Sequence, residues 1–307
     1  MGQAQKGVCA EPNLHAQYLL YNVVEDDAEV IRAKLVRLLD IFDHFDNEHY
    51  EAMVSGMVAV GSHYWSELYP GTRPVELAPF PDMQSEDRCA PVTPVDLFIQ
   101  IRADRLDICH AIGAEVHELL KMHVELVEQV RGFRYLDGRD LTGFVNGTAN
   151  ARGMRKLEVA LVGDDDPEFS GGSYVHVQRY RHDMTRWQYL DQKRQEHIIG
   201  RTKQENLALP HGDLPAFSHS RRTRMKDPEG KPLELLRQGM PYGDITVQGL
   251  FFVSCANSPS VFRKMLESMI YGDEHGDYDK LLDFTSAETG AAFFAPATDF
   301  IKQRATS

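Results

Sequence analysis

Hydrophobic and polar positions follow two different repeats along the first half of the chain. Residues 17–24 alternate and include several aromatic side chains, which is typical of a strand. Apolar residues within 27–45 and within 108–119 recur every three or four positions, which predicts two helices that each bury one face. Further β-rich runs lie at 53–60, 97–101 and 124–130. The predicted order is strand, helix, strand, strand, helix, strand, which is the ferredoxin-like arrangement.

The second half shows a similar order of elements after a turn-forming loop at 163–172. Its predicted elements are a strand at 174–180, a helix at 184–199, a strand at 250–254 and a helix at 259–270. We therefore predict an α+β fold with two antiparallel sheets and two ferredoxin-like halves, residues 1–150 and 151–307. Residues 203–232 have no periodic pattern, and irregular segments of that length are uncommon unless they carry function.

Composition and charge narrow the class of protein. The chain has 307 residues, of which 42% are hydrophobic and 26% charged, as in soluble globular proteins. A net charge of -13 disfavours nucleic acid as a partner, because such binding normally begins with a basic surface. No apolar run approaches the roughly 20 residues that span a bilayer, so we expect no membrane partner. No leader sequence is recognisable in residues 1–12, and we expect a cytoplasmic protein.

Several kinds of site are disfavoured by the absence of their motifs. The four cysteines form no CxxC pair, which argues against a disulfide framework, a structural zinc site and covalent haem attachment through CxxCH. They are Cys9, Cys89, Cys109 and Cys255. Phosphate-loop, dinucleotide-binding, GxSxG and HExxH patterns are also absent from the sequence.

The segment 132–150, GFRYLDGRDLTGFVNGTAN, is the most distinctive in the chain. Gly143 and Gly147 bracket three residues, so the backbone there could turn sharply and approach a flat ligand. Thr148 and Asn150 could supply hydrogen bonds. On residue types alone, an ordinary turn between domains explains the same pattern.

This segment resembles the GxxDG motif of the dye-decolourising peroxidases, in particular their bacterial cytoplasmic branch. Further segments occur in that family's order, and the resemblance covers roughly residues 130–297. They are GGSYVHVQRY (171–180), IGRTK (199–203), SHSRR (218–222), LLRQGMPYG (235–243) and GLFFVSCA (249–256). The resemblance implies two ferredoxin-like halves of the dimeric α+β barrel superfamily, with a non-covalent haem b held mainly by the second. It also implies oxidation of organic reductants or dyes by hydrogen peroxide through a ferryl intermediate.

The resemblance also implies roles for individual residues. His219 would be the axial iron ligand, and Asp279 would accept the hydrogen bond from its other ring nitrogen, although Asp273 and Asp277 lie close in sequence. Arg237 would stand above the iron and stabilise charge as the peroxide bond breaks; pairing with a haem propionate or a surface acid is the alternative. Arg222 would suit the haem edge and its propionates.

Other contacts are expected around the haem. Val145, Gly147 and Thr148 would approach it from the motif segment. Leu250 and Phe252, with Phe251 between them, would line the pocket or else belong to the core of a sheet. The family often relays electrons through surface aromatic residues, and the candidates here are Trp187, Tyr189, Tyr135 and Tyr242. Homo-oligomers, dimers or larger, are expected because ferredoxin-like sheets leave an edge or face to cover.

Asn146 departs from the family motif, which has aspartate at this position. A carboxylate can move a proton from one peroxide oxygen to the other, whereas an amide can only form hydrogen bonds. Three interpretations stay open: an engineered variant, a natural member relying on Arg237 and water, or a member specialised away from fast peroxide cleavage. The sequence also leaves open a haem-storing, haem-carrying or haem-sensing protein, and a ferredoxin-like small-molecule binder without haem.

Overall fold

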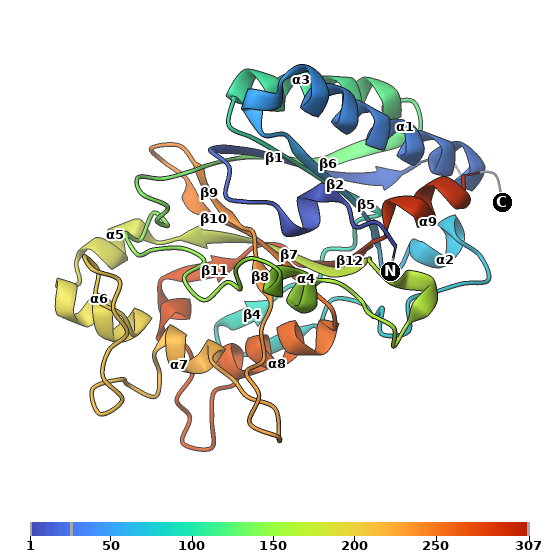
Figure 1. Cartoon of the computed structure of the whole chain (residues 1–307). Helices are drawn as coiled ribbons and strands as arrows, with labels where there is room; N and C mark the ends of the chain where they lie inside the picture. The colour runs from blue at the N-terminus through green and yellow to red at the C-terminus, as the bar shows by residue number, and fades with distance from the viewer. Residues whose placement is uncertain (1, 25–26, 306–307) are drawn as a thin grey trace.

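A computed structural model describes residues 2–24 and 27–305 of the chain. Its main feature is a single ten-stranded sheet (Figure 1). The strands of this sheet are β1 (His15–Val23), β2 (Ser55–Gly61), β5 (Leu97–Ala103), β6 (Val124–Phe133), β7 (Ser173–His182), β8 (Leu236–Arg237), β9 (Met240–Gly243), β10 (Gln248–Ala256), β11 (Thr285–Ala287) and β12 (Ala291–Ala295). A separate hairpin consists of β3 (Met83–Ser85) and β4 (Arg88–Ala90).

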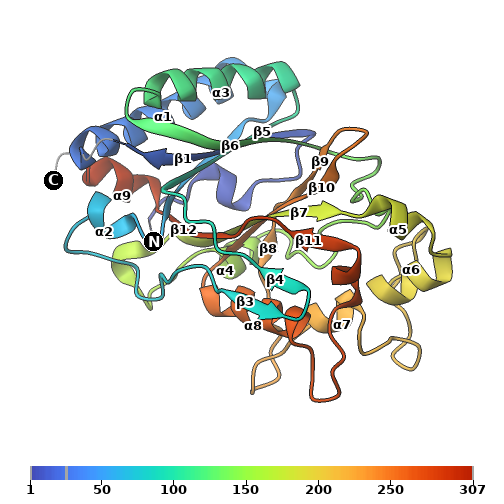
Figure 2. The same ribbon diagram turned by 180° about the vertical axis from the view of Figure 1, so that it is seen from behind.

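The helices lie outside the sheet (Figures 1 and 2). They are α1 (Ala28–Glu48), α2 (Trp65–Leu68), α3 (Leu106–Leu120), α4 (Arg155–Ala160), α5 (Met184–Gln188), α6 (Gln192–Ile199), α7 (His219–Thr223), α8 (Pro259–Ile270) and α9 (Thr298–Gln303). Short 3-10 turns are η1 (Lys6–Cys9), η2 (Tyr50–Ala52), η3 (Pro167–Phe169) and η4 (Lys280–Asp283). Within the described residues, no helix is both long and apolar enough to cross a membrane.

The sheet closes on itself, which corrects the expectation of two separate sheets. Its order is β11-β7-β12-β2-β5-β1-β6-β9-β10-β8, and β10 also pairs with β7, for example Val253 with Val177. The halves join where β6 pairs with β9 and where β12 pairs with β2, both antiparallel. Each half thereby supplies hydrogen-bonding partners for an edge that the other would leave open, and closure removes the exposed edges.

The two halves use the same spatial order of strands. In the first half the order is β2-β5-β1-β6, and in the second it is β9-β10-β7-β12. The elements predicted in the first half appear within a few residues of their expected bounds. In the second half, residues 184–199 form two helices, α5 and α6, because the side chain of Asp191 accepts a hydrogen bond from the backbone NH of Arg194 and starts a new helix.

Alternating side chains of the barrel strands enter two different cores. One set fills the interior, where Tyr18 stacks on Phe251 with ring centroids 4.2 Å apart. The other set faces outward, where residues such as Leu19 and Ile99 pack beneath α1 and α3. On the opposite side of the molecule, α8 covers the outer face of β7 and β10 (Figures 1 and 2). The site described next lies between α8 and that face.

Candidate active site

Two adjoining cavities lie beside α7 and α8: the smaller faces the outer side of β7 and β10, and the larger continues from it toward residues 145–149 and 224–226. Their volumes are about 140 and 360 Å³. Both are lined by Asn146, His219, Thr223, Arg237 and Met265, so they form one elongated space, which we call the slot. It therefore gathers His219, Arg237 and Asn146, which the sequence places in three separate segments.

The inner part of the slot has apolar walls. Leu250 and Phe252 line it from β10, whereas Phe251 between them is fully buried in the barrel core. Strand alternation explains this division, because neighbouring side chains point to opposite faces. The opposite wall is apolar as well and comes from α8: Phe262, Met265, Leu266 and Met269. Two facing apolar walls suit a flat hydrophobic ligand.

His219 is the first residue of α7, and its ring is oriented by a buried carboxylate. Its Nδ1 lies 2.6 Å from Oδ2 of Asp279, a residue with no exposed surface. The other carboxylate oxygen, Oδ1, accepts from the backbone NH of Leu281 at 3.0 Å. An ionised carboxylate only accepts hydrogen bonds, so Nδ1 carries the proton and Nε2 keeps a free lone pair. This is the arrangement of a histidine that binds a metal through Nε2.

A second histidine, His182, lines the slot, but both of its ring nitrogens have hydrogen-bond partners. His182 Nδ1 is 2.9 Å from the hydroxyl of Thr285, and its Nε2 is 3.2 Å from Oδ1 of Asp140. One of these two contacts would have to break before His182 could bind iron, whereas Nε2 of His219 has no partner among the described residues. The geometry therefore distinguishes His219 from His182, although both reach the same cavity.

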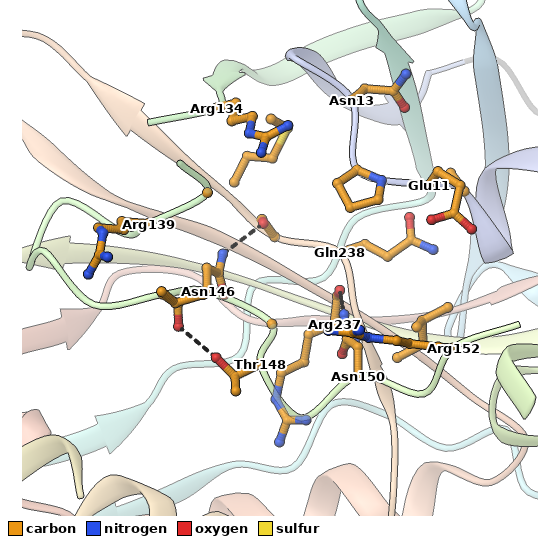
Figure 3. Close-up of a pocket in the computed structure, with 18 of the residues that line it drawn as sticks. Glu11, Asn13, Arg134, Arg139, Asn146, Thr148, Asn150, Arg152, Arg237 and Gln238 are labelled. Atoms are coloured by element: carbon orange, nitrogen blue, oxygen red, sulfur yellow. Dashed lines mark hydrogen bonds between the residues drawn. The ribbon is translucent and has the colours of Figure 1, made fainter. Parts of the chain in front are cut away.

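Arg237 reaches the slot from β8 without an acidic partner. Its guanidinium contacts only the sulfur of Met265 among the described residues, at 3.6 Å, and burial lowers its pKa to about 10. Asn150 holds its backbone in place through two hydrogen bonds, of 2.9 and 2.7 Å (Figure 3). A guanidinium that remains charged at neutral pH and lacks a counter-ion is suited to interact with an anionic or polarised ligand.

Asn146 sits in a tight turn between two glycines with left-handed backbone. Gly143 has a φ of +90° and Gly147 has a φ of +66°. Residues with a Cβ atom rarely adopt such conformations, whereas glycine adopts them readily. Asn146 Nδ2 donates to the carbonyl oxygen of Gly239 at 3.1 Å (Figure 3). Val145, Gly147 and Thr148, predicted as cofactor contacts, line the outer part of the slot.

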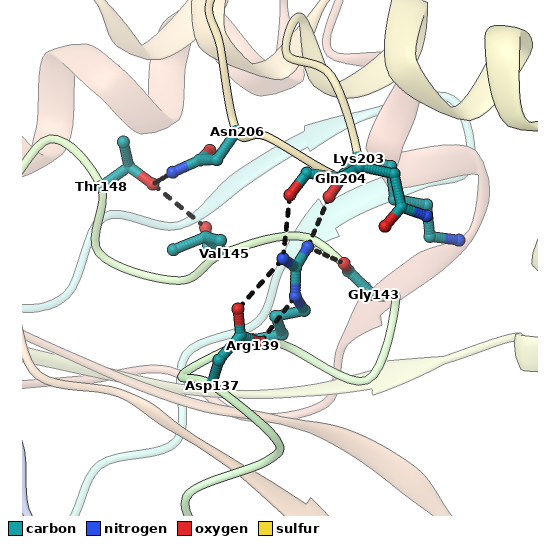
Figure 4. A network of polar contacts seen from close by, with 8 residues as sticks. All are labelled: Asp137, Arg139, Gly143, Val145, Thr148, Lys203, Gln204 and Asn206. Carbon is teal, nitrogen blue, oxygen red and sulfur yellow. Dashed lines mark hydrogen bonds and ion pairs between the residues drawn. The ribbon is translucent and has the colours of Figure 1, made fainter.

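Arg139 ties this turn to the segment that showed no sequence pattern (Figure 4). Its guanidinium donates to the carbonyl oxygens of Gly143, Lys203 and Gln204 at 2.9, 2.5 and 3.2 Å. It also pairs with Asp137 at 2.7 Å. The irregular stretch after α6 therefore holds the turn around Asn146 in place; we call this turn the motif loop. The same stretch leads on to His219 at the start of α7.

The outer end of the slot is cationic, a feature that the sequence analysis missed. Arg201, Arg224 and Lys226 line it. Burial, and secondly the nearby charge of Arg224, lowers the pKa of Arg201. Arg201 finds only neutral acceptors on Asn206. Arg201 lies in the IGRTK segment, but nothing in the sequence distinguished it from other basic residues. Two nearby arginines favour an anionic group between them.

Arg222 is not among the residues that line the slot, and its contact with the haem edge stays a prediction. Its side chain is buried, and its Nη2 lies 2.8 Å from Asp273. The next residue along α7, Thr223, lines the slot instead. Asp273 is thereby engaged with Arg222, and Asp279 is the acid that meets His219.

The aromatic residues considered as relay points lie in different environments. Trp187 is buried between Phe144 and Phe284, and its indole NH donates to the carbonyl oxygen of Thr142 at 2.9 Å. Tyr189, two residues later, is 86% exposed. Tyr242 is buried and Tyr135 is partly exposed. Electron relay through any of them stays a prediction.

Comparisons with known proteins agree with this architecture. The family model described as "Dyp-type peroxidase, N-terminal" matches residues 5–134, and "Dyp-type peroxidase, C-terminal" matches residues 137–300. A dye-decolorizing peroxidase of Rhodococcus erythropolis is 40% identical over 250 residues, covering 81% of this chain and 73% of that protein. A dye-decolorizing peroxidase of Mycobacterium tuberculosis is 39% identical over 250 residues, covering 81% of this chain and 75% of that protein.

Solved structures extend the similarity over nearly the whole chain. A crystal structure of a provisionally assigned DyP-type peroxidase protein from Shewanella oneidensis is 48% identical with a TM-score of 0.97, covering 99% of both chains. DyPB from Rhodococcus jostii RHA1 is 34% identical with a TM-score of 0.94, covering 98% of this chain and 99% of that one. The resemblance seen in the sequence is confirmed: this chain belongs to the DyP-type peroxidase family, and its enzyme class is that of the haem peroxidases.

Proposed function

We propose that this chain holds a haem b non-covalently in the slot and uses it to oxidise an organic reductant or dye with hydrogen peroxide. One observation carries the proposal. His219, oriented by Asp279 at 2.6 Å, lines the same narrow space as the unpaired guanidinium of Arg237. A variant of the Rhodococcus jostii relative is described in complex with heme.

The residues present fit the chemical character of a haem. Leu250, Phe252 and the side chains of α8 would contact the apolar faces of the macrocycle. Arg201 and Arg224 at the outer end of the slot would pair with the two propionates of the haem. This pairing would relieve the repulsion between the two arginines. His219 Nε2 would bind the iron, because a neutral imidazole is a favoured axial ligand.

The bound haem would supply the redox centre through which two electrons pass from the reductant to peroxide, so that peroxide is reduced and the reductant is oxidised. Asp279 acts on His219 as a positioning residue, because its charge keeps the proton on Nδ1 and raises the basicity of Nε2. Arg237 places a fixed positive charge where negative charge develops as peroxide is cleaved. Its pKa of about 10 keeps it protonated at neutral pH.

Asn146 limits proton transfer at this site. Its amide group already donates to Gly239, and an amide does not take up a proton at ordinary pH. Water would then have to carry the proton between the peroxide oxygens, with Arg237 supplying the charge. We therefore propose that peroxide cleavage is slower in this chain than in a variant with aspartate at this position.

Haem titration of three histidine variants tests the proposal. Hemin added to the wild-type protein is expected to give a Soret band with saturation at one equivalent. His219→Ala should weaken binding strongly, whereas His182→Ala should retain an axially ligated spectrum, because both of its ring nitrogens are already engaged. His211→Ala is the matched control, since this histidine is exposed and only eight residues from His219. Unchanged binding in His219→Ala would refute the assignment.

Turnover separates catalysis from mere haem binding. A peroxidase dye should be bleached by the haem-loaded wild type with hydrogen peroxide. A normal Soret band without turnover would instead favour the haem-storing, haem-carrying or haem-sensing alternative, and failure to take up hemin would favour a haem-free binding protein.

We also propose that each half of the chain, residues 1–150 and 151–307, is ferredoxin-like. The proposal is supported by the shared strand order, β2-β5-β1-β6 in one half and β9-β10-β7-β12 in the other. Homo-oligomerisation stays a prediction, which the mass of the purified protein in solution would test.

A further inference from the structure

A second cavity adjoins the slot at the motif loop, and Figure 3 shows residues that line it. Its volume is about 500 Å³, and its walls come from the N-terminal segment, β5, the residues just after β6, the motif loop and the segment from β8 to β9. The β8 strand divides the two spaces, because Arg237 extends toward the slot whereas Gln238 points the opposite way, toward Glu11 (Figure 3). Asn146 and Arg237 line both spaces, whereas Arg102, Arg134 and Arg152 line only this second cavity and have no part in the proposed chemistry.

Positive side chains dominate its lining although the whole chain carries a net charge of -13. Two of the cations are neutralised locally, since Arg139 pairs with Asp137 at 2.7 Å and Lys156 pairs with Glu11 at 2.6 Å. Four more have no carboxylate within 4 Å among the residues that the structure describes: Arg237, which also lines the slot, and Arg102, Arg134 and Arg152, which do not. Such an excess of cations within one concavity raises the local concentration of anions.

Arg102 is the unusual member of this group because it is almost completely buried, at 4% exposure. Its Nη1 donates to the side-chain oxygen of Gln238 at 3.2 Å and to the backbone oxygen of the same residue at 3.3 Å. Its buried Nε has no acceptor among the described residues. A buried charge with only neutral partners is costly, and an anionic ligand would offset that cost.

The other lining residues indicate which kind of anion would fit the cavity. Leu236, Met240 and Pro241 add apolar surface beside the arginines. Guanidinium groups match the two oxygens of a carboxylate in a forked geometry. We propose that this cavity binds a small organic carboxylate, with Arg102 at its floor and Arg134 and Arg152, both exposed, at its mouth.

Calorimetric titration of the haem-loaded protein with benzoate tests the proposal, because haem then occupies the cationic end of the slot. The double variant Arg134→Gln/Arg152→Gln should bind benzoate at least about tenfold more weakly, since hydrogen bonds to charged groups are among the stronger ones. Arg131→Gln is the matched control: it removes an exposed arginine from β6 that lines a different cavity. Neutral benzyl alcohol should not discriminate between these proteins.

The location of the site can be checked from its buried end. Arg102→Lys keeps the charge and loses the forked donors, so it should also weaken benzoate binding, with the melting temperature reporting whether the fold survives. The absence of saturable binding to the wild type, or an equal loss in Arg131→Gln, would overturn the proposal. If the protein takes up no hemin, the same titration on the haem-free protein still decides the matter, because it compares variants outside the slot.

Discussion

Replacing Asp279 by asparagine is the sharpest test of how the proposed iron ligand is oriented. The two oxygens of Asp279 accept from different donors, His219 Nδ1 at 2.6 Å and the backbone NH of Leu281 at 3.0 Å. Asparagine has one oxygen, so its NH₂ group must face one of these donors. If it faces the ring, the imidazole can comply only by moving its proton to Nε2, the nitrogen that should bind iron.

The size of the effect follows from the burial of the pair. Asp279 has no exposed surface, so water cannot replace the lost charge-assisted hydrogen bond. Such bonds contribute about 1.5–3 kcal/mol. Loss of a partner that orients a metal ligand typically costs about 10- to 100-fold in metal affinity or activity. We therefore expect Asp279→Asn to bind hemin about 10- to 100-fold more weakly, with a raised iron midpoint potential because the ligand is less basic.

Hemin titration followed at the Soret band, together with spectroelectrochemistry, measures both quantities. Asp277→Asn is the control, because it removes a carboxylate two residues away that has no contact with His219 among the described residues. Wild-type affinity and potential in Asp279→Asn would refute the reasoning. So would an equal loss in Asp277→Asn, since the effect would then be a general one of charge.

Three further predictions concern the motif loop and the core. Asn146→Asp should accelerate the reaction with peroxide in stopped-flow mixing, because a carboxylate can shuttle the proton; equal rates would contradict this. Gly147→Ala should destabilise the fold by about 1–2 kcal/mol in denaturant titrations, since its φ is +66°, whereas Gly163→Ala, with open space around the new carbon, should have little effect. Burial lowers the pKa of His176 to about 3, so the folded protein binds fewer protons than the unfolded chain between about pH 3 and 6.5, and stability falls as pH falls through that window. His176→Gln should lower the slope of the free energy of unfolding against pH by up to about 1.4 kcal/mol per pH unit within that window. His275→Gln, which replaces an exposed histidine, should leave the slope unchanged. An unchanged slope in His176→Gln would contradict the prediction.

Local patterns predicted the elements that bury one face. The helical spacing in α1 and α3 reports which side of each helix meets a core, so it can be read within a short window. β1 is buried on both faces, and its aromatic and other apolar residues rather than one-sided burial made it recognisable as a strand. The single helix predicted at 184–199 was wrong because a side-chain cap at Asp191 competes with helical periodicity there. The strands β8, β9 and β12 are short or interrupted, and their pattern is correspondingly weak.

The candidate site was accessible from the sequence only through resemblance. His219, Asp279 and Arg237 lie in segments that match the family, yet nothing in their spacing shows that they share one cavity. The ion pair of Arg222 with Asp273 could not be foreseen for the same reason, because the two residues are 51 positions apart. The cations Arg201 and Arg224 were missed because a basic residue looks the same in a sequence whether or not a neighbour shares its pocket.

By itself the sequence predicted the main strands and helices of the first half, the acidic net charge of the chain and the presence of a distinctive glycine-bracketed turn. Only the tertiary structure decided that the halves close into one barrel, that Phe252 faces the slot while Phe251 faces the core, and that His219 rather than His182 keeps a free ring nitrogen. The reason is physical: burial patterns are set by neighbours within a few residues, whereas the proton on His219 is set by a carboxylate 60 positions away.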